Sequence, residues 1–306
     1  VCIVTATSFK TSEYTKMLYE LAPELNNCEF GQLVSAKLPH LKSVIRLHSA
    51  SSAGMNSWED FLKLAIQKSA ADLVAIQSTL SADEPINIQY TSGTTGYPKG
   101  ATLSHHNILN NGYLAAEIMK FTHKDRLVIP VPLYHCFGMV FGNLGCIAHG
   151  ATMIYPNDGF DPDSVLQTVQ EEKATALFGV PTMFIAELEH PDFEKFDLKT
   201  LRTGIMAGSP CPIEVMKKVQ TVMNMYEVQI AYGMTETSPV STQTKIGTPL
   251  EKQVSTVGQI HPHLEVKIIE ENTGNVVPVG EPGELCTRGY SVMLGYWEDD
   301  EKTKNA

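Results

Sequence analysis

Short apolar, β-branched runs alternate with helical periodicity along most of the chain. The run from Val1 to Thr5 predicts a strand, and apolar residues spaced three and four apart predict an amphipathic helix over residues 11–22. The same reasoning predicts strands at 44–47, 86–91, 127–131, 151–155, 174–180, 203–207 and 226–232. It predicts further helices at 58–70, 104–119, 141–148, 162–172 and 213–223. Such alternation is typical of β-α-β units around parallel sheets, so an α/β fold is expected.

The pattern changes after about Leu250, where helical periodicity is weak. Short strands are predicted at 266–269, 276–277 and 285–288, separated by the turns Asn272-Thr273-Gly274 and Glu281-Pro282-Gly283. These features predict a small antiparallel β unit, with a hairpin packed on the preceding sheet as the alternative. We therefore expect three parts, at residues 1–120, 121–249 and 250–306.

Composition narrows the class of protein. The 306 residues are 43% hydrophobic and 19% charged, so the chain can bury a large core and intrinsic disorder is excluded as its main state. Lys and Arg number 23 against 34 Asp and Glu, giving a formal net charge of −11 that argues against nucleic acid or anionic lipid as a general partner. No apolar run reaches the roughly 18 to 20 residues of a spanning helix, so we expect a soluble protein without a transmembrane segment.

Three further features bear on redox state, metal binding and the extent of the chain. The six cysteines include no C-x-x-C pair, which favours reduced thiols in an intracellular compartment over a disulfide framework or a zinc site. His105-His106 and His261-x-His263 lack further ligands at zinc spacing and are better explained as solvated or capping histidines. The chain begins without Met and stops at Ala306 within an unfinished element, so we expect a segment of a longer protein.

The strongest local signal is a loop at residues 90–100, Tyr-Thr-Ser-Gly-Thr-Thr-Gly-Tyr-Pro-Lys-Gly, which follows a predicted strand. Glycines allow close approach of the main chain, hydroxyl groups donate hydrogen bonds, and Lys99 supplies a positive charge. Such a loop suits phosphate and would let an acidic chain hold ATP. A P-loop NTPase is excluded, because Pro98 precedes Lys99 and Gly100 follows it; a kinase loop also fits badly. A plain surface turn is the alternative.

The loop resembles the AMP-binding signature of the adenylate-forming superfamily, which includes acyl-CoA synthetases, peptide-synthetase adenylation domains and luciferases. Every fixed position of [FY]-T-S-G-[ST]-T-G-x-P-K-G is present, and Tyr97 occupies the free one. Further segments resemble the family's motifs in the same order: 132–138 (P-L-Y-H-C-F-G), 207–210 (A-G-S-P), 231–236 (A-Y-G-M-T-E) and 283–289 (G-E-L-C-T-R-G) running on to Gly295-Tyr296. Residues around the loop are most similar to the medium-chain branch known as acyl-CoA synthetase family member 2.

The resemblance implies the ligand-binding residues. Nucleotide phosphates would contact Thr91, Ser92, Gly93, Thr94, Thr95, Gly96, Tyr97, Pro98 and Lys99. Adenine would lie on Ala207, Gly208 and Ser209 and stack on Tyr232 beside Gly233. Thr235 and Glu236 would meet the α-phosphate and Mg²⁺, and His135 would face the substrate carboxylate. Lys99, His135, Thr235 and Glu236 are thus the expected catalytic residues. Read alone, His135 would more simply be a core histidine, and 207–210 an ordinary β-α turn.

The implied reaction consumes ATP and joins a fatty acid to coenzyme A through an acyl-adenylate. Positioning and charge neutralisation suffice for its first half, so no covalent nucleophile is needed. Amino-acid-activating relatives carry an Asp where this chain has Phe137-Gly138, which favours an uncharged acyl chain. Small or adaptable apolar residues suit such a tail, and we assign Gly138, Gly204, Met206 and Met234 to its pocket.

The implied fold is the large N-terminal domain of an acyl-CoA synthetase, truncated, with two αβαβα-type sheets and a small β-barrel-like unit. The family's T-G-D segment, hinge and C-terminal lid domain with its lysine are expected beyond Ala306, and residues before Val1 would complete the first sheet. Partners would be small molecules only, and a mitochondrial location follows from the resemblance alone. An aryl-acid-activating relative and a non-catalytic ATP-binding fragment are the alternatives.

Overall fold

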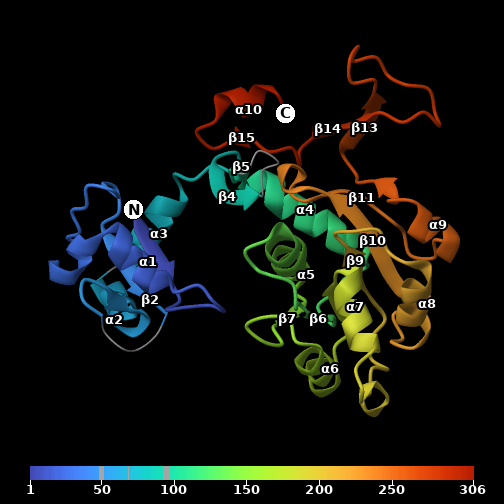
Figure 1. Cartoon of the computed structure of the whole chain (residues 1–306), viewed down its shortest axis with the longest axis horizontal. Helices are drawn as coiled ribbons and strands as arrows, with labels where there is room; N and C mark the ends of the chain where they lie inside the picture. The colour runs from blue at the N-terminus through green and yellow to red at the C-terminus, as the bar shows by residue number, and fades with distance from the viewer. Residues whose placement is uncertain (48–51, 68, 92–96) are drawn as a thin grey trace. The chain divides into compact units, whose positions relative to one another are not determined.

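The computed structural model describes residues 1–47, 52–67, 69–91 and 97–306, which form two compact units, Val1–Leu80 and Ser81–Ala306 (Figure 1). The expected parts 1–120, 121–249 and 250–306 stay a prediction. Among the described residues, no helix combines the length and the apolar character that crossing a membrane requires.

The first unit is built on a small parallel sheet. Its strands β1 (Cys2–Thr5), β2 (Ser43–Arg46) and β3 (Asn56–Ser57) lie in that order. Leu18 of α1 (Tyr14–Leu21) is buried in its core, which also includes Ala22, Leu25 of the 3₁₀ turn η1 (Pro23–Asn27), Leu33, Leu41, Val44 and Met55.

The helix predicted over residues 58–70 is divided in the structure. It forms α2 (Trp58–Lys63), a 3₁₀ turn η2 (Leu64–Gln67) and the start of α3 (Ala70–Gln77). A capping box starts α3: the Ser69 hydroxyl accepts from Asp72 N, and the Asp72 carboxylate accepts from Ser69 N. Helix α3 therefore begins at the last residue of the predicted helix, and its course to Gln77 was not predicted.

The second unit contains a seven-stranded sheet. β6 (Arg126–Val128), β7 (Thr152–Ile154), β8 (Ala176–Gly179), β9 (Thr203–Ala207) and β10 (Glu227–Gly233) are parallel. β11 (Val240–Gln243) and β12 (Gln259–Ile260) extend it antiparallel, in the order β12-β11-β10-β9-β8-β6-β7. The predicted alternation of strands and helices is thus confirmed, and so is the α/β class.

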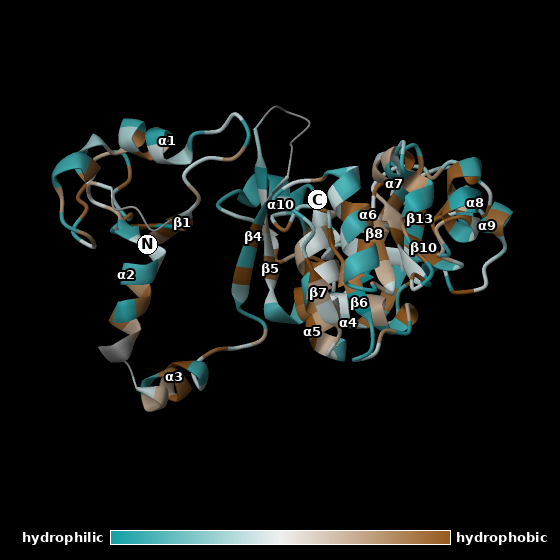
Figure 2. Ribbon diagram, turned by 90° about the horizontal axis from the view of Figure 1, so that it is seen from below, coloured by the Kyte–Doolittle hydropathy of each residue, from teal (hydrophilic) through white to brown (hydrophobic). Residues whose placement is uncertain are grey.

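Successive strand residues point to opposite sides of this sheet, and those on both sides are apolar. Helices therefore cover both faces. On one face Leu177, Met206 and Ile230 pack with α6 (Pro162–Glu171), α7 (Pro181–Leu188), α8 (Ile213–Thr221) and α9 (Leu250–Ser255). On the other, Phe178 and Ile205 pack with α4 (His105–Ile118), the π-helix η3 (Phe137–Leu144) and α5 (Gly145–His149). In Figure 2 polar, teal residues lie beside apolar, brown ones along α6 and α8, as expected for helices with one buried face.

The helix predicted at 141–148 begins earlier and has π geometry in its first part. Glycine allows α4 to approach it closely: a Cβ on Gly112 would lie 2.7 Å from the carbonyl oxygen of Val140 and 3.1 Å from Gly145 N. Helix α7 was not predicted, although Pro181 at its first turn is a common start signal.

Two smaller antiparallel sheets complete the second unit. β4 (Pro85–Thr91) pairs with β5 (Lys99–Ser104), which pairs with β15 (Gly295–Tyr296). β13 (Leu264–Ile269) pairs with β14 (Glu284–Gly289), while Val276 makes only a single bridge to Ile269. The remaining short elements are η4 (Phe193–Lys195), η5 (Thr235–Thr237) and α10 (Asp300–Lys304). No closed barrel forms within the part of the chain that the structure describes.

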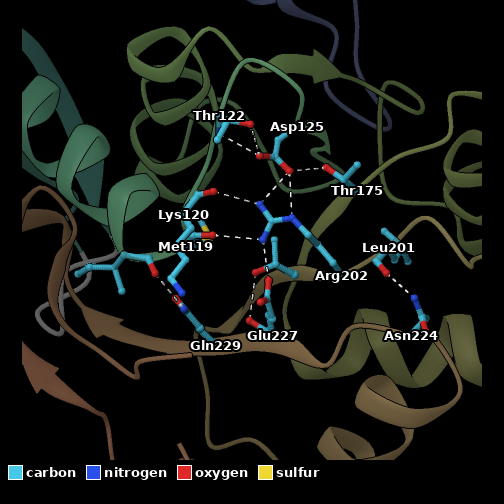
Figure 3. A network of polar contacts seen from close by, with 12 residues as sticks. Met119, Lys120, Thr122, Asp125, Thr175, Leu201, Arg202, Asn224, Glu227 and Gln229 are labelled. Carbon is cyan, nitrogen blue, oxygen red and sulfur yellow. Dashed lines mark hydrogen bonds and ion pairs between the residues drawn. The ribbon is translucent and has the colours of Figure 1, made fainter. Parts of the chain in front are cut away.

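An ionic network joins residues at the amino-terminal ends of four parallel strands (Figure 3). Arg202, just before β9, donates to Asp125 (2.8 Å), before β6, and to Glu227 (2.7 Å), the first residue of β10. Thr175, before β8, donates to the same Asp125 oxygen at 2.8 Å. Arg202 also donates to two carbonyl oxygens at the end of α4, those of Met119 and Lys120. This network therefore fixes the amino-terminal edge of the sheet, which leaves the opposite edge for ligand binding.

Candidate functional site

The hairpin of β4 and β5 holds the two ends of the predicted phosphate loop. Thr91 and Lys99 are directly opposite each other in its register, and the Thr91 hydroxyl donates to the carbonyl oxygen of Lys99 at 3.4 Å. Tyr97 is exposed and Pro98 follows it. The predicted phosphate ligands Ser92, Gly93, Thr94, Thr95 and Gly96 lie outside the described residues. Lys99 is therefore the part of the loop that can be followed into the site.

Lys99 is joined to Glu236 through the hydroxyl of Tyr296. Its Nζ donates to Tyr296 Oη at 3.1 Å, and Oη donates to Glu236 Oε1 at 2.7 Å. Nζ also lies 4.8 Å from the centre of the Tyr296 ring, within cation–π range. The hydrogen bond to Tyr296 and the negative charge of Glu236 raise the pKa of Lys99, so the lysine is positively charged at neutral pH.

The residues predicted to bind adenine lie at the ends of two neighbouring parallel strands. β9 and β10 pair with Ala207 opposite Ala231, so Gly208 and Ser209 follow one strand end next to Tyr232 at the other. A cavity of about 430 Å³ opens there, lined by Gly208, Ser209, Pro210, Cys211, Ile230, Ala231, Tyr232, Gly233, Val254, Ser255, Thr256 and Val257. Its volume lies in the range of small-molecule sites. Another cavity, about 560 Å³ along 193–199, borders none of the predicted site residues.

A smaller cavity of about 80 Å³ adjoins the first and includes the predicted catalytic histidine. Its lining residues are His135, Phe137, Phe141, Ala207, Gly208, Ala231, Tyr232, Gly233, Pro239 and Val240. Nδ1 of His135 accepts from the main-chain N–H of Phe137 at 3.0 Å, so the ring proton belongs on Nε2. Burial lowers the pKa of His135, which keeps the ring neutral at pH 7.

Glycine is required where Gly233 passes the β10–β11 turn. A Cβ at Gly233 would lie 1.7 Å from the carbonyl oxygen of Pro239, so no side chain can be accommodated. Tyr232 lies at the end of β10, just before this close approach, and Thr235 and Glu236 lie just after it in η5. The structure therefore brings Lys99, Tyr232, Thr235 and Glu236 together at this edge of the sheet through β10, η5 and the β5–β15 pairing.

The four residues predicted for the acyl pocket line neither of these cavities. Gly204 and Met206 are buried inside the sheet, and a Cβ on Gly204 would lie 1.9 Å from the carbonyl oxygen of Leu177. A Cβ on Gly138 would lie 2.5 Å from the carbonyl oxygen of Pro132, and Met234 is exposed. Packing thus accounts for the glycines, and the role of all four residues in substrate binding stays a prediction.

Sequence reasoning gave Tyr296 only a structural role and did not select Val254 to Val257. Tyr296 belongs to the G-Y end of the last motif, but only the pairing of β15 with β5 shows that its hydroxyl reaches Lys99. The segment from Val254 to Val257 carries no chemical motif, and it reaches the cavity because α9 packs beside β10. Such contacts between distant segments leave no local signal in the sequence.

The residues present fit magnesium held together with a nucleotide. Mg²⁺ commonly takes one or two carboxylates and completes its shell with phosphate oxygens and water. Glu236 supplies one carboxylate and Thr235 a neighbouring hydroxyl. No group of three His, Cys, Asp or Glu side chains suited to a metal occurs among the described residues. This donor set suits a metal that arrives with phosphate; that Glu236 and Thr235 would hold it from the protein side stays a prediction.

Comparison with protein families decides the assignment. The family described as AMP-binding enzyme matches residues 19–297. The chain belongs to the AMP-binding enzyme family. The resemblance stated from the motifs is thereby confirmed over most of the chain.

Individual relatives and a solved structure are consistent with this family assignment. YngI of Bacillus subtilis (strain 168), named an acyl-CoA synthetase, is 51% identical over 299 residues, covering 98% of this chain and 54% of the relative. The Danio rerio protein named medium-chain acyl-CoA ligase ACSF2, mitochondrial, is 45% identical, covering 99% of this chain and 50% of the relative. The chain thus spans about half the length of these relatives. The crystal structure of the anthranilate CoA ligase AuaEII with anthranoyl-AMP matches with a TM-score of 0.83 at 20% identity, covering 100% of this chain and 54% of that one, and supports the fold.

Proposed function

We propose that the chain is the nucleotide-binding and acyl-binding part of an ATP-dependent, AMP-forming CoA ligase for medium-chain fatty acids. The observation that carries the proposal is a shared wall: Gly208, Ala231, Tyr232 and Gly233 line both the larger and the smaller cavity. A nucleotide and an acid in these cavities would lie in contact, as transfer between them requires. Family membership and the name of the Danio rerio relative support the reaction and the acid.

The proposed reaction has two displacement steps. A carboxylate oxygen of the acid bonds to the α-phosphorus of ATP while the bond to pyrophosphate breaks. The sulfur of coenzyme A, having lost its proton, then bonds to the acyl carbon while the bond to AMP breaks. Lys99 would bind phosphate oxygens, where negative charge develops in the first step, and the Thr91 hydroxyl would join it on turning away from the Lys99 carbonyl oxygen. Mg²⁺ on Glu236 and Thr235 would neutralise further phosphate charge.

His135 is suited to hold the acid. Its neutral ring carries a proton on Nε2, which can donate to a carboxylate oxygen without pairing strongly with it. A neutral donor of this kind leaves the carboxylate nucleophilic, whereas a full positive charge would stabilise the ground state as well. His135 would therefore orient the attacking oxygen beside the nucleotide.

Aromatic side chains form the apolar wall on the acyl side. Phe137 and Phe141 line the smaller cavity, and both pack on Phe178, with ring centres 5.4 and 5.1 Å from it. These described side chains place apolar surface next to His135, which favours an uncharged tail over an amino acid.

An intracellular and specifically mitochondrial location rests on the resemblance and on the name of the Danio rerio relative.

Pyrophosphate exchange tests the first step directly. Purified whole gene product is incubated with ATP, Mg²⁺, labelled pyrophosphate and a series of acids that includes short, medium and long aliphatic chains, benzoate and anthranilate. We expect exchange to be highest with medium-chain acids, and thioester to form when coenzyme A is added. Lys99→Ala and Glu236→Ala should each reduce exchange about 100-fold or more, as loss of a charged transition-state contact does.

Two exposed residues outside the site provide matched controls. Lys124→Ala and Glu214→Ala remove the same charges from exposed positions before β6 and in α8, and both should exchange like the wild type. Absence of exchange with every acid, at the level of Lys99→Ala, would contradict the proposal and favour a non-catalytic ATP-binding chain. Higher exchange with benzoate or anthranilate would instead replace the fatty acid by an aryl acid.

A further inference from the structure

Tyr296 separates two opposite charges of the nucleotide site. Lys99 and Glu236 are both described, yet no ion pair within 4.0 Å joins them directly; each is hydrogen-bonded to the Tyr296 hydroxyl instead. A phenol has one proton to donate, so the bonds have a fixed direction from Lys99 through Tyr296 to Glu236. A phenol keeps its proton at neutral pH, and at 2.7 Å from Glu236 Oε1 the Tyr296 hydroxyl is placed to donate it.

The main chain holds Tyr296 in place. β15 pairs with β5, with Tyr296 opposite Ala101, and Trp297 N donates to the carbonyl oxygen of Gly100 at 2.7 Å. Tyr296 N donates to the hydroxyl of Thr303 at 2.8 Å. Only 9% of Tyr296 is exposed. The hydroxyl is thus held by elements far from both charged residues in the sequence.

The glutamate is tied to the same segment. Met293 lies three residues before Tyr296. Its main-chain N–H donates to the carbonyl oxygen of Glu236 at 2.9 Å. Lys99 lies on β5, whose neighbour is β15. The segment 293–297 therefore bridges the strand that carries the lysine and the turn that carries the glutamate, and Tyr296 is its one side chain that hydrogen-bonds to both of these described residues.

We infer that Tyr296 is a positioning residue for nucleotide binding, which keeps Lys99 and Glu236 from neutralising each other and leaves both available to Mg²⁺ and phosphate. The inference rests on the proposed function of this site. Lys99 gives one of its three N–H donors to the phenol and retains two for phosphate oxygens. Glu236 accepts on Oε1 and retains Oε2 for a metal. A direct lysine–glutamate pair would compete with both ligands.

The variant Tyr296→Phe removes the hydroxyl and keeps the ring that lies under Lys99. We expect the KM for Mg·ATP to rise about 10- to 100-fold, the range for loss of a hydrogen bond to charged groups, with the KM for the acid changed less than threefold. Tyr290→Phe is the matched control, because that hydroxyl bonds to Asn111 at 3.3 Å and to no charged group among the described residues. It should leave the KM for Mg·ATP unchanged.

A double-mutant cycle separates positioning from a merely structural role. When Glu236→Gln has removed the charge that Tyr296 separates from Lys99, adding Tyr296→Phe should weaken Mg·ATP binding by less than threefold, as measured by calorimetry. Independent effects of the two substitutions, or equal losses of affinity for Mg·ATP and acid in Tyr296→Phe, would overturn the inference.

Calorimetry also distinguishes this failure from failure of the proposed function. If the wild type binds Mg·ATP but activates no acid, the proposed ligase reaction is wrong, while a selective loss of Mg·ATP affinity in Tyr296→Phe still supports the positioning role. If the wild type is active and Tyr296→Phe binds Mg·ATP as tightly, the positioning role is wrong and the ligase reaction stands.

Discussion

Replacing Arg202 by Met tests how the amino-terminal edge of the large sheet is stabilised. Arg202 makes hydrogen bonds to Asp125, Glu227 and two main-chain carbonyl groups, and the Asp125 side chain is only 6% exposed. Removing the guanidinium leaves a buried carboxylate without its opposite charge, which typically costs about 3–5 kcal/mol. For a unit of this size, that loss lowers the unfolding midpoint by about 10 °C.

The dependence on pH identifies Asp125 as the cause. Burial would raise its pKa, but hydrogen bonds from Thr175, Thr122 and Arg202 outweigh burial and hold the pKa below its usual range. A lowered pKa contributes stability above the ordinary carboxyl range, and that contribution is lost as pH falls through the folded-state value. Without Arg202 burial dominates, so the difference between Arg202→Met and the wild type should shrink as the pH is lowered from 7 to 4.

Urea unfolding at both pH values measures the free energy of unfolding. Arg202→Lys keeps the charge but not the planar fork, so it should recover only part of the loss. Arg288→Met is the matched control, because its ion pair with Glu265 is exposed and should contribute less than about 1 kcal/mol. A loss under about 1 kcal/mol for Arg202→Met, or the same loss at pH 4 and pH 7, would refute this reasoning.

Two buried titratable groups give further predictions. Burial lowers the pKa of His261 to about 4, so the free energy of unfolding should increase by up to about 3 kcal/mol between pH 4 and 6.5. The variant His261→Gln should abolish this increase. His123→Gln, at an exposed position, should keep it. Glu187 is fully buried without a hydrogen-bond partner among the described residues, and burial raises its pKa well above the ordinary value. Ionising this carboxyl group costs more in the folded chain than in the unfolded chain. The free energy of unfolding should therefore fall by about 1.4 kcal/mol per pH unit as the pH rises from the ordinary carboxyl pKa toward the raised one. Glu187→Gln should remove that slope. Chemical denaturation between pH 4 and 9 checks both; unchanged slopes in the variants would show that other groups cause them.

The sequence predicted the repeating part of the fold because each piece of it is local. Strands β8, β9 and β10 are short apolar runs whose alternate residues reach opposite cores, and helices α6 and α8 have amphipathic spacing. The motifs at the ends of β9 and β10 could be placed for the same reason, since parallel strands bring their carboxyl ends together.

Features that depend on partners distant in sequence were missed. Strand β5 was not predicted: Lys99 and Gly100 were assigned to the loop and Ser104 to the following helix. Its pairing with both β4 and β15 outweighs the weak strand preference of these residues. The close packing of α4 on η3 and α5 depends on Gly112 and Gly145, which lie against each other, and periodicity cannot reveal such a contact. The bond from Lys99 to Tyr296 joins residues 197 positions apart, so it required the structure.

Strand β9 has the ionic network at one end and the turn predicted to bind adenine at the other. Five residues at about 3.3 Å each separate Arg202 from Gly208, and Ile205 and Met206 among them point to opposite cores. Deleting one residue would exchange the faces of Ile205 and Met206 and misalign Ala207 with Ala231 of β10. Changes in chain length are therefore excluded from β9, and insertions acquired during divergence of this protein should fall in exposed segments such as 190–197.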